Sequence, residues 1–179
     1  MSKAKVATVW LDGCSGCHMS LLDMDETIVA VAQKADLVYG PLVDAQVFPE
    51  GVDVTLVEGA VSSQDDLEKI QLVRSRSRLV VALGDCAITG NIPALRNQFK
   101  LEDVVARGFV ETESTQIGEI PGNSILPRLL KKVRPIQEFV KVDAHIPGCP
   151  PDADTIWYVL TELLAGRMPK WTEKNLCYD

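Results

Sequence analysis

The chain has 179 residues, of which 46% are hydrophobic and 24% charged, a composition that predicts one globular domain over residues 1–179. Its net charge of −7 argues against a nucleic-acid-binding protein, which would usually carry a basic surface. No apolar stretch has the length of a membrane span, and the first residues lack the apolar core of a secretory signal. We therefore expect a cytoplasmic protein whose cysteines stay reduced and bind metal or take part in redox chemistry.

Apolar runs rich in Val and Leu alternate with segments of helical periodicity along most of the chain. In chain order they predict a strand at 5–10, a helix at 20–34, strands at 36–40 and 52–59, a helix at 63–76, strands at 78–84 and 139–144, and a helix at 152–165. Continuous apolar strands that alternate with helices are typical of a parallel α/β sheet with helices on both faces.

Residues 101–137 do not follow this alternation. The stretch 111–136 contains three prolines and no clear strand pattern. We expect a partly irregular insertion before the last strand, with a short helix near 125–133. Insertions of this length often carry binding surface.

Four of the five cysteines follow predicted strands. Cys14 and Cys17 come after the first strand, Cys86 after the fourth and Cys149 after the fifth. Because the carboxyl ends of parallel strands share one sheet edge, these residues are expected to converge there. Nearby glycines would let the backbone approach a bulky ligand, and the helix that follows Cys17 would offer N–H groups to a negatively charged one.

Several interpretations of these thiols remain open at this point. A Cys-x-x-Cys pair is typical of a thioredoxin-like disulfide, which would leave Cys86 and Cys149 unexplained. A structural zinc site also takes four thiolates, but usually as two close pairs, and here only Cys14 and Cys17 are close in sequence. Buried packing is a further alternative, although Cys86 and Cys149 lie in Gly- and Pro-rich loops. A 4Fe–4S cluster would use all four.

Other polar residues border the cysteine loops. His18 and His145 could replace a thiolate or hydrogen-bond a cluster sulfide, although an ordinary helix-end or loop hydrogen bond is the favoured interpretation. Glu58 ends the third predicted strand, where it could carry protons or serve as a charge at a helix start. We interpret Cys177 as an unpaired thiol of the C-terminal tail.

Four motifs together resemble the small subunit of nickel–iron hydrogenases: WLDGCSGCHMSLLD, VEGAVSS, GDCAITGNIP and HIPGCPPDADTI. The closest resemblance is to the soluble NAD-reducing, bidirectional type. A related family is the 20 kDa cluster-bearing subunit of respiratory complex I. That subunit carries a tandem Cys-Cys where this chain has Cys14-Ser15-Gly16-Cys17. The difference favours hydrogenase.

The resemblance implies a flavodoxin-like fold in which Cys14, Cys17, Cys86 and Cys149 ligate one 4Fe–4S cluster. It places the nickel–iron site on a separate large subunit, and further clusters, FMN and NAD on diaphorase partners. This chain would then conduct electrons and would hold no catalytic residue itself.

Three other functions stay as alternatives. They are a cluster subunit of a complex I-type quinone oxidoreductase, a zinc-stabilised binding module and a flavin carrier. FMN on this chain is the weakest of these, because flavodoxin phosphate loops use Ser and Thr hydroxyls and the loop 12–18 offers thiols.

Overall fold

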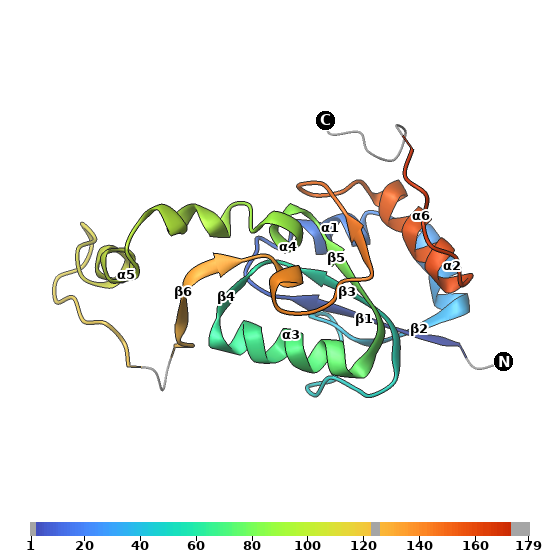
Figure 1. Cartoon of the computed structure of the whole chain (residues 1–179), viewed down its shortest axis with the longest axis horizontal. Coiled ribbons are helices and arrows are strands. Elements are labelled where there is room, and N and C mark those ends of the chain that lie inside the picture. The colour runs from blue at the N-terminus through green and yellow to red at the C-terminus, as the bar shows by residue number, and fades with distance from the viewer. Residues whose placement is uncertain (1–2, 123–125, 173–179) are drawn as a thin grey trace.

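The structure is a computed structural model that describes residues 3–122 and 126–172. Within these residues a five-stranded parallel sheet has the order β2-β1-β3-β5-β7 (Figure 1). Its strands are β1 (Ala4–Trp10), β2 (Ala35–Tyr39), β3 (Val52–Glu58), β5 (Ser77–Leu83) and β7 (Ala144–Ile146). This 2-1-3-4-5 arrangement is the flavodoxin-like order. The predicted fold class is confirmed.

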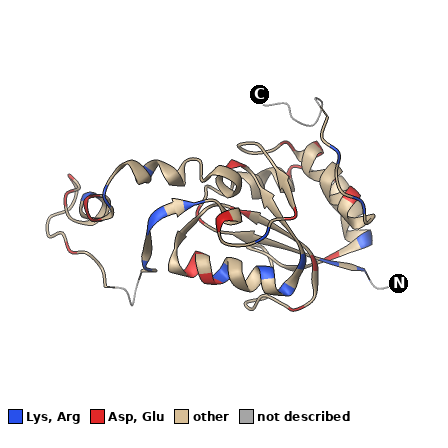
Figure 2. Ribbon diagram, viewed as in Figure 1, with Lys and Arg blue, Asp and Glu red and all other residues tan. Residues whose placement is uncertain are grey.

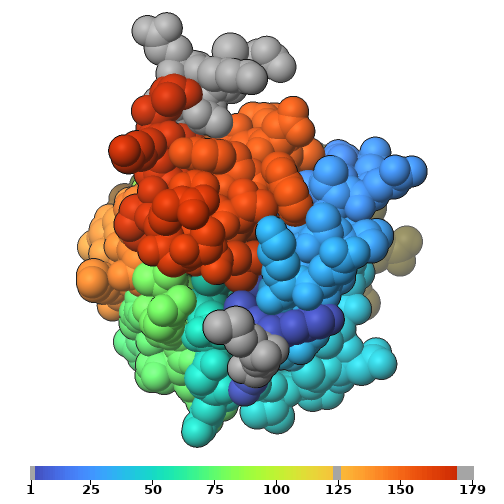
Figure 3. Space-filling view, turned by 90° about the vertical axis from the view of Figure 1, so that its right-hand side faces the viewer, coloured from blue at the N-terminus to red at the C-terminus, as the bar shows by residue number. Residues whose placement is uncertain are grey.

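Helices cover both faces of the sheet. One face packs against α3 (Gln64–Arg76) and α4 (Asp85–Thr89), and the other against α1 (Gly16–Leu22) and α6 (Ala153–Leu164). Helix α2 (Thr27–Lys34), light blue in Figure 3, lies beside α6, which is orange-red there. Successive residues of β5 alternate between the two cores, with Val80 and Ala82 in the first and Val81 and Leu83 in the second. No helix in the described part of the chain is long and apolar enough to cross a bilayer.

Helix α3 shows how local sequence sets an element. Ser63 and Asp66 form a capping box, in which the Ser63 hydroxyl accepts from the Asp66 N–H and the Asp66 carboxylate accepts from the Ser63 N–H. Acidic residues occupy the first turn of α3 and basic residues its last turn, which suits the helix dipole (Figure 2).

The helix predicted at 20–34 is two helices. Helix α1 ends at Leu22, and α2 begins at Thr27. Between them Asp25 adopts a left-handed φ of 47°. A left-handed residue cannot continue a right-handed helix, and Asp tolerates this conformation better than most residues. The apolar periodicity carried no sign of this break.

The last strand begins later than predicted. The prediction placed it at 139–144, whereas β7 is Ala144–Ile146. The Asp143 carboxylate accepts a hydrogen bond from the Val80 N–H at 2.9 Å and from Arg74 Nη1 at 2.6 Å. The Asp143 backbone N–H also donates to the Val80 carbonyl at 2.8 Å, so both polar backbone groups of Val80 are bonded to Asp143, and the residue pairing of β5 with β7 starts at Ala144.

The insertion also differs from the prediction. The short helix expected near 125–133 is wrong, because β6 (Leu129–Arg134) is a strand that pairs antiparallel with β4 (Val61–Ser63). Residues 123–125 lie outside the described part. The Arg96 guanidinium bridges this pair by donating to the carbonyls of Ser62 and Leu130. A short apolar run fits either element, and the free edge of β4 decided in favour of a strand.

Two helical segments, one just before the insertion and one at its start, were not predicted. They are the 3-10 helix η1 (Pro93–Gln98) and the helix α5 (Leu101–Phe109). A second 3-10 turn, η2 (Ile136–Glu138), leads back toward β7. Figure 1 shows that α5 and the chain after it extend away from the sheet.

Candidate metal centre

The carboxyl ends of four strands are level with one another. The register pairs Trp10 with Glu58, Glu58 with Leu83, and Leu83 with Ile146. The cysteines follow this row within a few residues along β1, β5 and β7. The sheet therefore brings three cysteine-bearing segments to one edge, with Cys17 in the first turn of α1 and Cys86 in α4.

The cysteine loops are tied to each other by backbone hydrogen bonds. The Gly84 N–H donates to the Ile146 carbonyl at 2.8 Å, and the Asp85 N–H donates to the Gly148 carbonyl at 2.9 Å. In return the Gly148 N–H donates to Asp85 Oδ1 at 2.9 Å. The loop that holds Cys86 and the loop that holds Cys149 therefore form one unit.

Two glycines make room for this convergence. Gly84 has a φ of 80°, and a Cβ at this position would clash with Cys17 Sγ. Gly148 has a φ of 137°, and a Cβ there would lie 2.5 Å from Pro151 Cα. Other L-residues at either position would meet both backbone strain and a clash. The contact at Gly84 also shows that the Cys17 thiol lies directly against the loop of Cys86.

The four thiols influence one another electrostatically. Burial raises the pKa of Cys17, and the charges of Glu58, Cys86, Cys14 and Cys149 raise it further. Burial also raises the pKa of Cys86, followed by the charge of Cys149, while a hydrogen bond from the Ile92 backbone opposes the rise. Cys17 is buried, Cys86 is half-buried, and Cys14 and Cys149 are exposed. The structure therefore brings the four predicted cysteines together at one partly open edge.

Glu58 and His18 form a buried pair beside Cys17. His18 Nδ1 lies 2.5 Å from Glu58 Oε2, and the His18 backbone N–H donates to the same oxygen at 2.9 Å. Glu58 thus sits at the start of α1, which agrees with its interpretation as a helix-start charge. His18 Nε2 is buried and has no hydrogen-bond partner among the described residues.

Two backbone N–H groups at the start of α1, which were expected to face a ligand, already donate hydrogen bonds within the chain. The Gly16 N–H donates to Cys14 Sγ at 3.4 Å, and the His18 N–H is used by Glu58. The hydrogen bond from the Gly16 N–H would stabilise the thiolate of Cys14, whereas the His18 N–H bonds Glu58 and reaches no sulfur. The other residues named from sequence lie apart: His145 is exposed within β7, and Cys177 falls outside the described residues.

Asn91 belongs to the site but sequence reasoning did not single it out. Its Nδ2 donates to Cys149 Sγ at 3.3 Å, across 58 positions of sequence. The only local signal is the Gly90-Asn91 dipeptide that ends α4, which is typical of a turn.

The donor set fits an iron–sulfur cluster. Four thiols on three neighbouring segments, with a glycine that leaves space for one sulfur, offer the ligands that a 4Fe–4S cluster takes. Over residues 3–122 and 126–172, no three His, Cys, Asp or Glu side chains are grouped closely enough to hold one metal ion.

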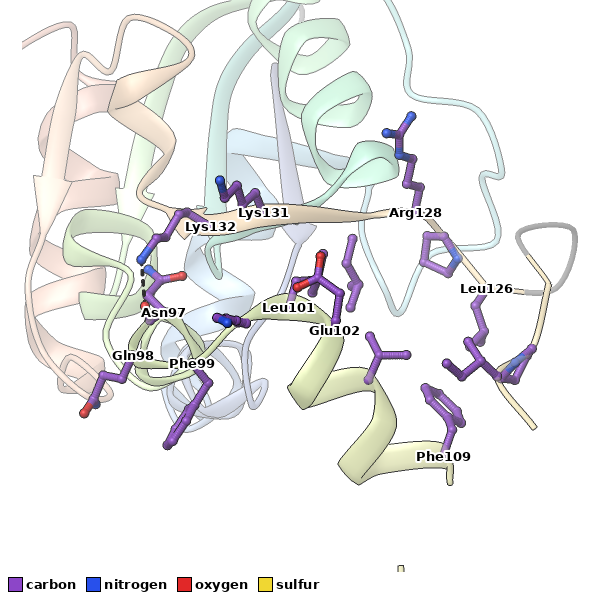
Figure 4. Close-up of a pocket in the computed structure, with 16 residues that line it drawn as sticks. Asn97, Gln98, Phe99, Leu101, Glu102, Phe109, Leu126, Arg128, Lys131 and Lys132 are labelled. Atoms are coloured by element: carbon purple, nitrogen blue, oxygen red, sulfur yellow. Dashed lines mark hydrogen bonds between the residues drawn. The ribbon is translucent and has the colours of Figure 1, made fainter. Parts of the chain in front are cut away.

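A separate cavity of about 850 Å³ lies in the insertion (Figure 4). It is bounded by the end of η1, by α5 and by β6, and no cysteine lines it. Apolar side chains such as Phe99 and Phe109 share its wall with Lys100, Arg128, Lys131 and Lys132. The cavity is distinct from the cysteine edge.

Comparison with known proteins places the chain in a family. The family described as NADH ubiquinone oxidoreductase, 20 Kd subunit, matches residues 14–163, a range that includes all four cysteines of the site. The chain belongs to this family.

Relatives within the family are hydrogenase subunits. The chain is 40% identical over 168 residues to the delta subunit of the NAD-reducing hydrogenase HoxS of Cupriavidus necator, covering 92% of this chain and 80% of that subunit. It is 41% identical over 174 residues to a subunit of the F420-non-reducing hydrogenase vhu of Methanocaldococcus jannaschii, covering 97% of this chain and 60% of that longer relative. The expected resemblance to hydrogenase small subunits is confirmed.

Solved structures of hydrogenases also resemble this chain. A chain of an NAD⁺-reducing [NiFe]-hydrogenase in its H₂-reduced state superposes with a TM-score of 0.95 at 40% identity, covering 99% of this chain and 100% of that one. A chain of the [NiFeSe]-hydrogenase of Dm. baculatum matches with a TM-score of 0.64 at 19% identity, covering 98% of this chain and 69% of that one, a likeness of fold alone.

Proposed function

We propose that this chain is the electron-transfer subunit of a nickel–iron hydrogenase and that Cys14, Cys17, Cys86 and Cys149 ligate one 4Fe–4S cluster. The observation that carries the proposal is the convergence of these four thiols at one sheet edge in a member of this family. Residues 1–179 would then act as a single iron–sulfur domain.

The partners follow from the same proposal. A large subunit would hold the nickel–iron site, and diaphorase subunits would hold further clusters, FMN and the NAD site. The assembly would catalyse H₂ + NAD⁺ → NADH + H⁺, for which a cytoplasmic location is suitable. NAD as acceptor is supported by the HoxS delta subunit and by the NAD⁺-reducing structure.

The residues of this chain would hold the cluster and conduct single electrons. When bound, the cluster supplies a site that accepts and returns one electron at a time. Cys17 is buried and its thiol pKa is raised, and the positive charge of bound iron would favour its thiolate. Exposed Cys14 and Cys149 lie on the open side of the edge, where a redox partner can approach.

Metal and sulfide analysis tests the proposal. Anaerobically purified complex should contain about four iron and four acid-labile sulfide for the cluster of this chain, with an EPR signal after reduction. A full chain that holds stoichiometric zinc and no sulfide would show a binding module instead. Mass spectrometry of the co-purifying chains separates a hydrogenase from a complex I-type assembly.

A further inference from the structure

One turn of the chain contacts thiols in two different loops. Helix α4 ends at Thr89, and Gly90 and Asn91 follow with φ values of 88° and 31°. Asn91 Nδ2 donates to Cys149 Sγ at 3.3 Å, and the Ile92 backbone lies near enough to Cys86 to lower the pKa of that thiol. The turn 90–92 therefore gives one of the four sulfurs a side-chain N–H donor and lies beside a second.

The residue type at position 91 is restricted by its backbone. A φ of 31° lies in the left-handed region, which Gly, Asn and Asp adopt most readily. Of these three, Asn alone carries a side-chain N–H donor. The Asn91 N–H donates to Thr89 Oγ1 at 3.3 Å, and the Asn91 carbonyl accepts from the Ala94 N–H at 3.1 Å. These bonds hold the side chain where it reaches Cys149.

We propose that Asn91 tunes the reduction potential of the cluster by donating a hydrogen bond to Cys149 Sγ. This inference rests on the proposed function. One-electron reduction adds negative charge to the cluster and its thiolates without forming or breaking a covalent bond. A fixed N–H donor stabilises the more negative, reduced state more strongly, because hydrogen bonds to charged acceptors are the stronger ones. Asn91 therefore raises the midpoint potential.

The test compares midpoint potentials in the full chain loaded anaerobically with iron and sulfide. Asn91→Gly keeps the left-handed turn and removes the donor, and Asn91→Asp keeps the size but replaces the donor with a carboxylate. Asp25→Gly is the matched control, because Asp25 is also a non-glycine residue with positive φ, 47°, and within the described residues it makes no hydrogen bond to a cysteine.

EPR-monitored redox titration gives the readout. At the midpoint of the unaltered chain, the ratio of reduced to oxidised cluster should fall severalfold and up to about tenfold in Asn91→Gly, where tenfold corresponds to about 59 mV for one electron. This ratio should fall further in Asn91→Asp, and it should not change in Asp25→Gly. Unchanged or raised midpoints in both Asn91 variants would overturn the inference.

A second measurement needs no substitution. The reduced, unaltered chain with ¹⁵N in its asparagine side chains should show a weak nitrogen coupling to the cluster in pulsed EPR. Absence of that coupling would also overturn the role of Asn91, even where the variants bind iron poorly. If the unaltered chain holds no iron and sulfide, the proposed function itself fails, and that outcome is distinct from an unchanged midpoint.

Discussion

At the scale of single residues, His18 and Glu58 form a buried polar pair beside the four thiols. Glu58 is 1% exposed and accepts two hydrogen bonds from His18, one from the backbone and one from the ring. These bonds connect the end of β3 to the first turn of α1, which carries Cys17. The pair therefore stabilises the segment of Cys14 and Cys17 by fixing the first turn of α1 to the end of β3.

Removing the Glu58 carboxylate should destabilise the fold. Glu58→Ala would leave the His18 N–H and Nδ1 without their partner in a buried place, at a cost of about 2–3 kcal/mol. Urea unfolding of the full chain measures the change. Glu68→Ala, on the exposed face of α3, is the matched control and should change the free energy of unfolding little. Equal effects of the two substitutions would contradict a structural role for the pair.

At the scale of elements, the Asp143 carboxylate anchors the segment that leads into β7 by bonding both Arg74 and the Val80 N–H. Burial raises the pKa of Asp143, but hydrogen bonds from the Val80 N–H and Arg74 outweigh it and hold the pKa below its ordinary value. The link joins α3, β5 and the segment that leads to Cys149. A single side chain thus fixes the segment from which the edge strand β7 and the loop of Cys149 continue.

Asp143→Asn should lower stability in a pH-dependent way. A carboxyl with a lowered pKa in the folded state adds stability that is complete above its unfolded-state pKa, about 3.8. That stability is lost as the pH falls from there through the lower folded-state pKa. We expect the substitution to cost about 1–3 kcal/mol at pH 7.

Urea unfolding at several pH values measures the effect of Asp143→Asn. The difference from the unaltered chain should shrink as the pH falls below about 3.8. Glu113→Gln, at a solvent-exposed ion pair with Arg107, is the control and should leave the unfolding curve in place. A difference that stays constant over the whole pH range would contradict a charge-dependent link.

At the scale of the whole molecule, the site is an edge assembled from three loops rather than a pocket. The cavity of the insertion lies between η1, α5 and β6 and has no cysteine in its lining (Figure 4). Exposed Cys14 and Cys149 leave the cysteine edge open for a partner. This arrangement suits a chain that passes electrons between partner subunits.

Cys149→Ser tests this role in the assembled complex. Loss of one thiolate ligand should abolish hydrogen-dependent NAD reduction, while NADH-driven dye reduction by the diaphorase subunits persists. Both rates are measured on the same purified complex. Cys177→Ser is the control and should retain both activities. Cluster loss in Cys177→Ser, with retention in Cys149→Ser, would show that Cys177 is the fourth ligand.

Local patterns were sufficient for much of this fold. The four longer strands of the sheet and helices α3 and α6 were predicted nearly to their ends, because apolar runs and capping residues act within a few positions. The break at Asp25, the late start of β7 and the strand β6 were missed. Each of these depends on a backbone conformation or a pairing edge that the apolar pattern does not encode.

The sequence by itself determined that four cysteines follow the carboxyl ends of parallel strands, and hence that they meet at one edge. Only the tertiary structure decided which polar groups surround those thiols. The Glu58 carboxylate takes an N–H of α1 that was expected to face a ligand, and Asn91 reaches Cys149 across 58 positions. The succession of strands and helices along the chain follows from local periodicity, whereas hydrogen-bond partners depend on which distant segments the completed sheet places in contact.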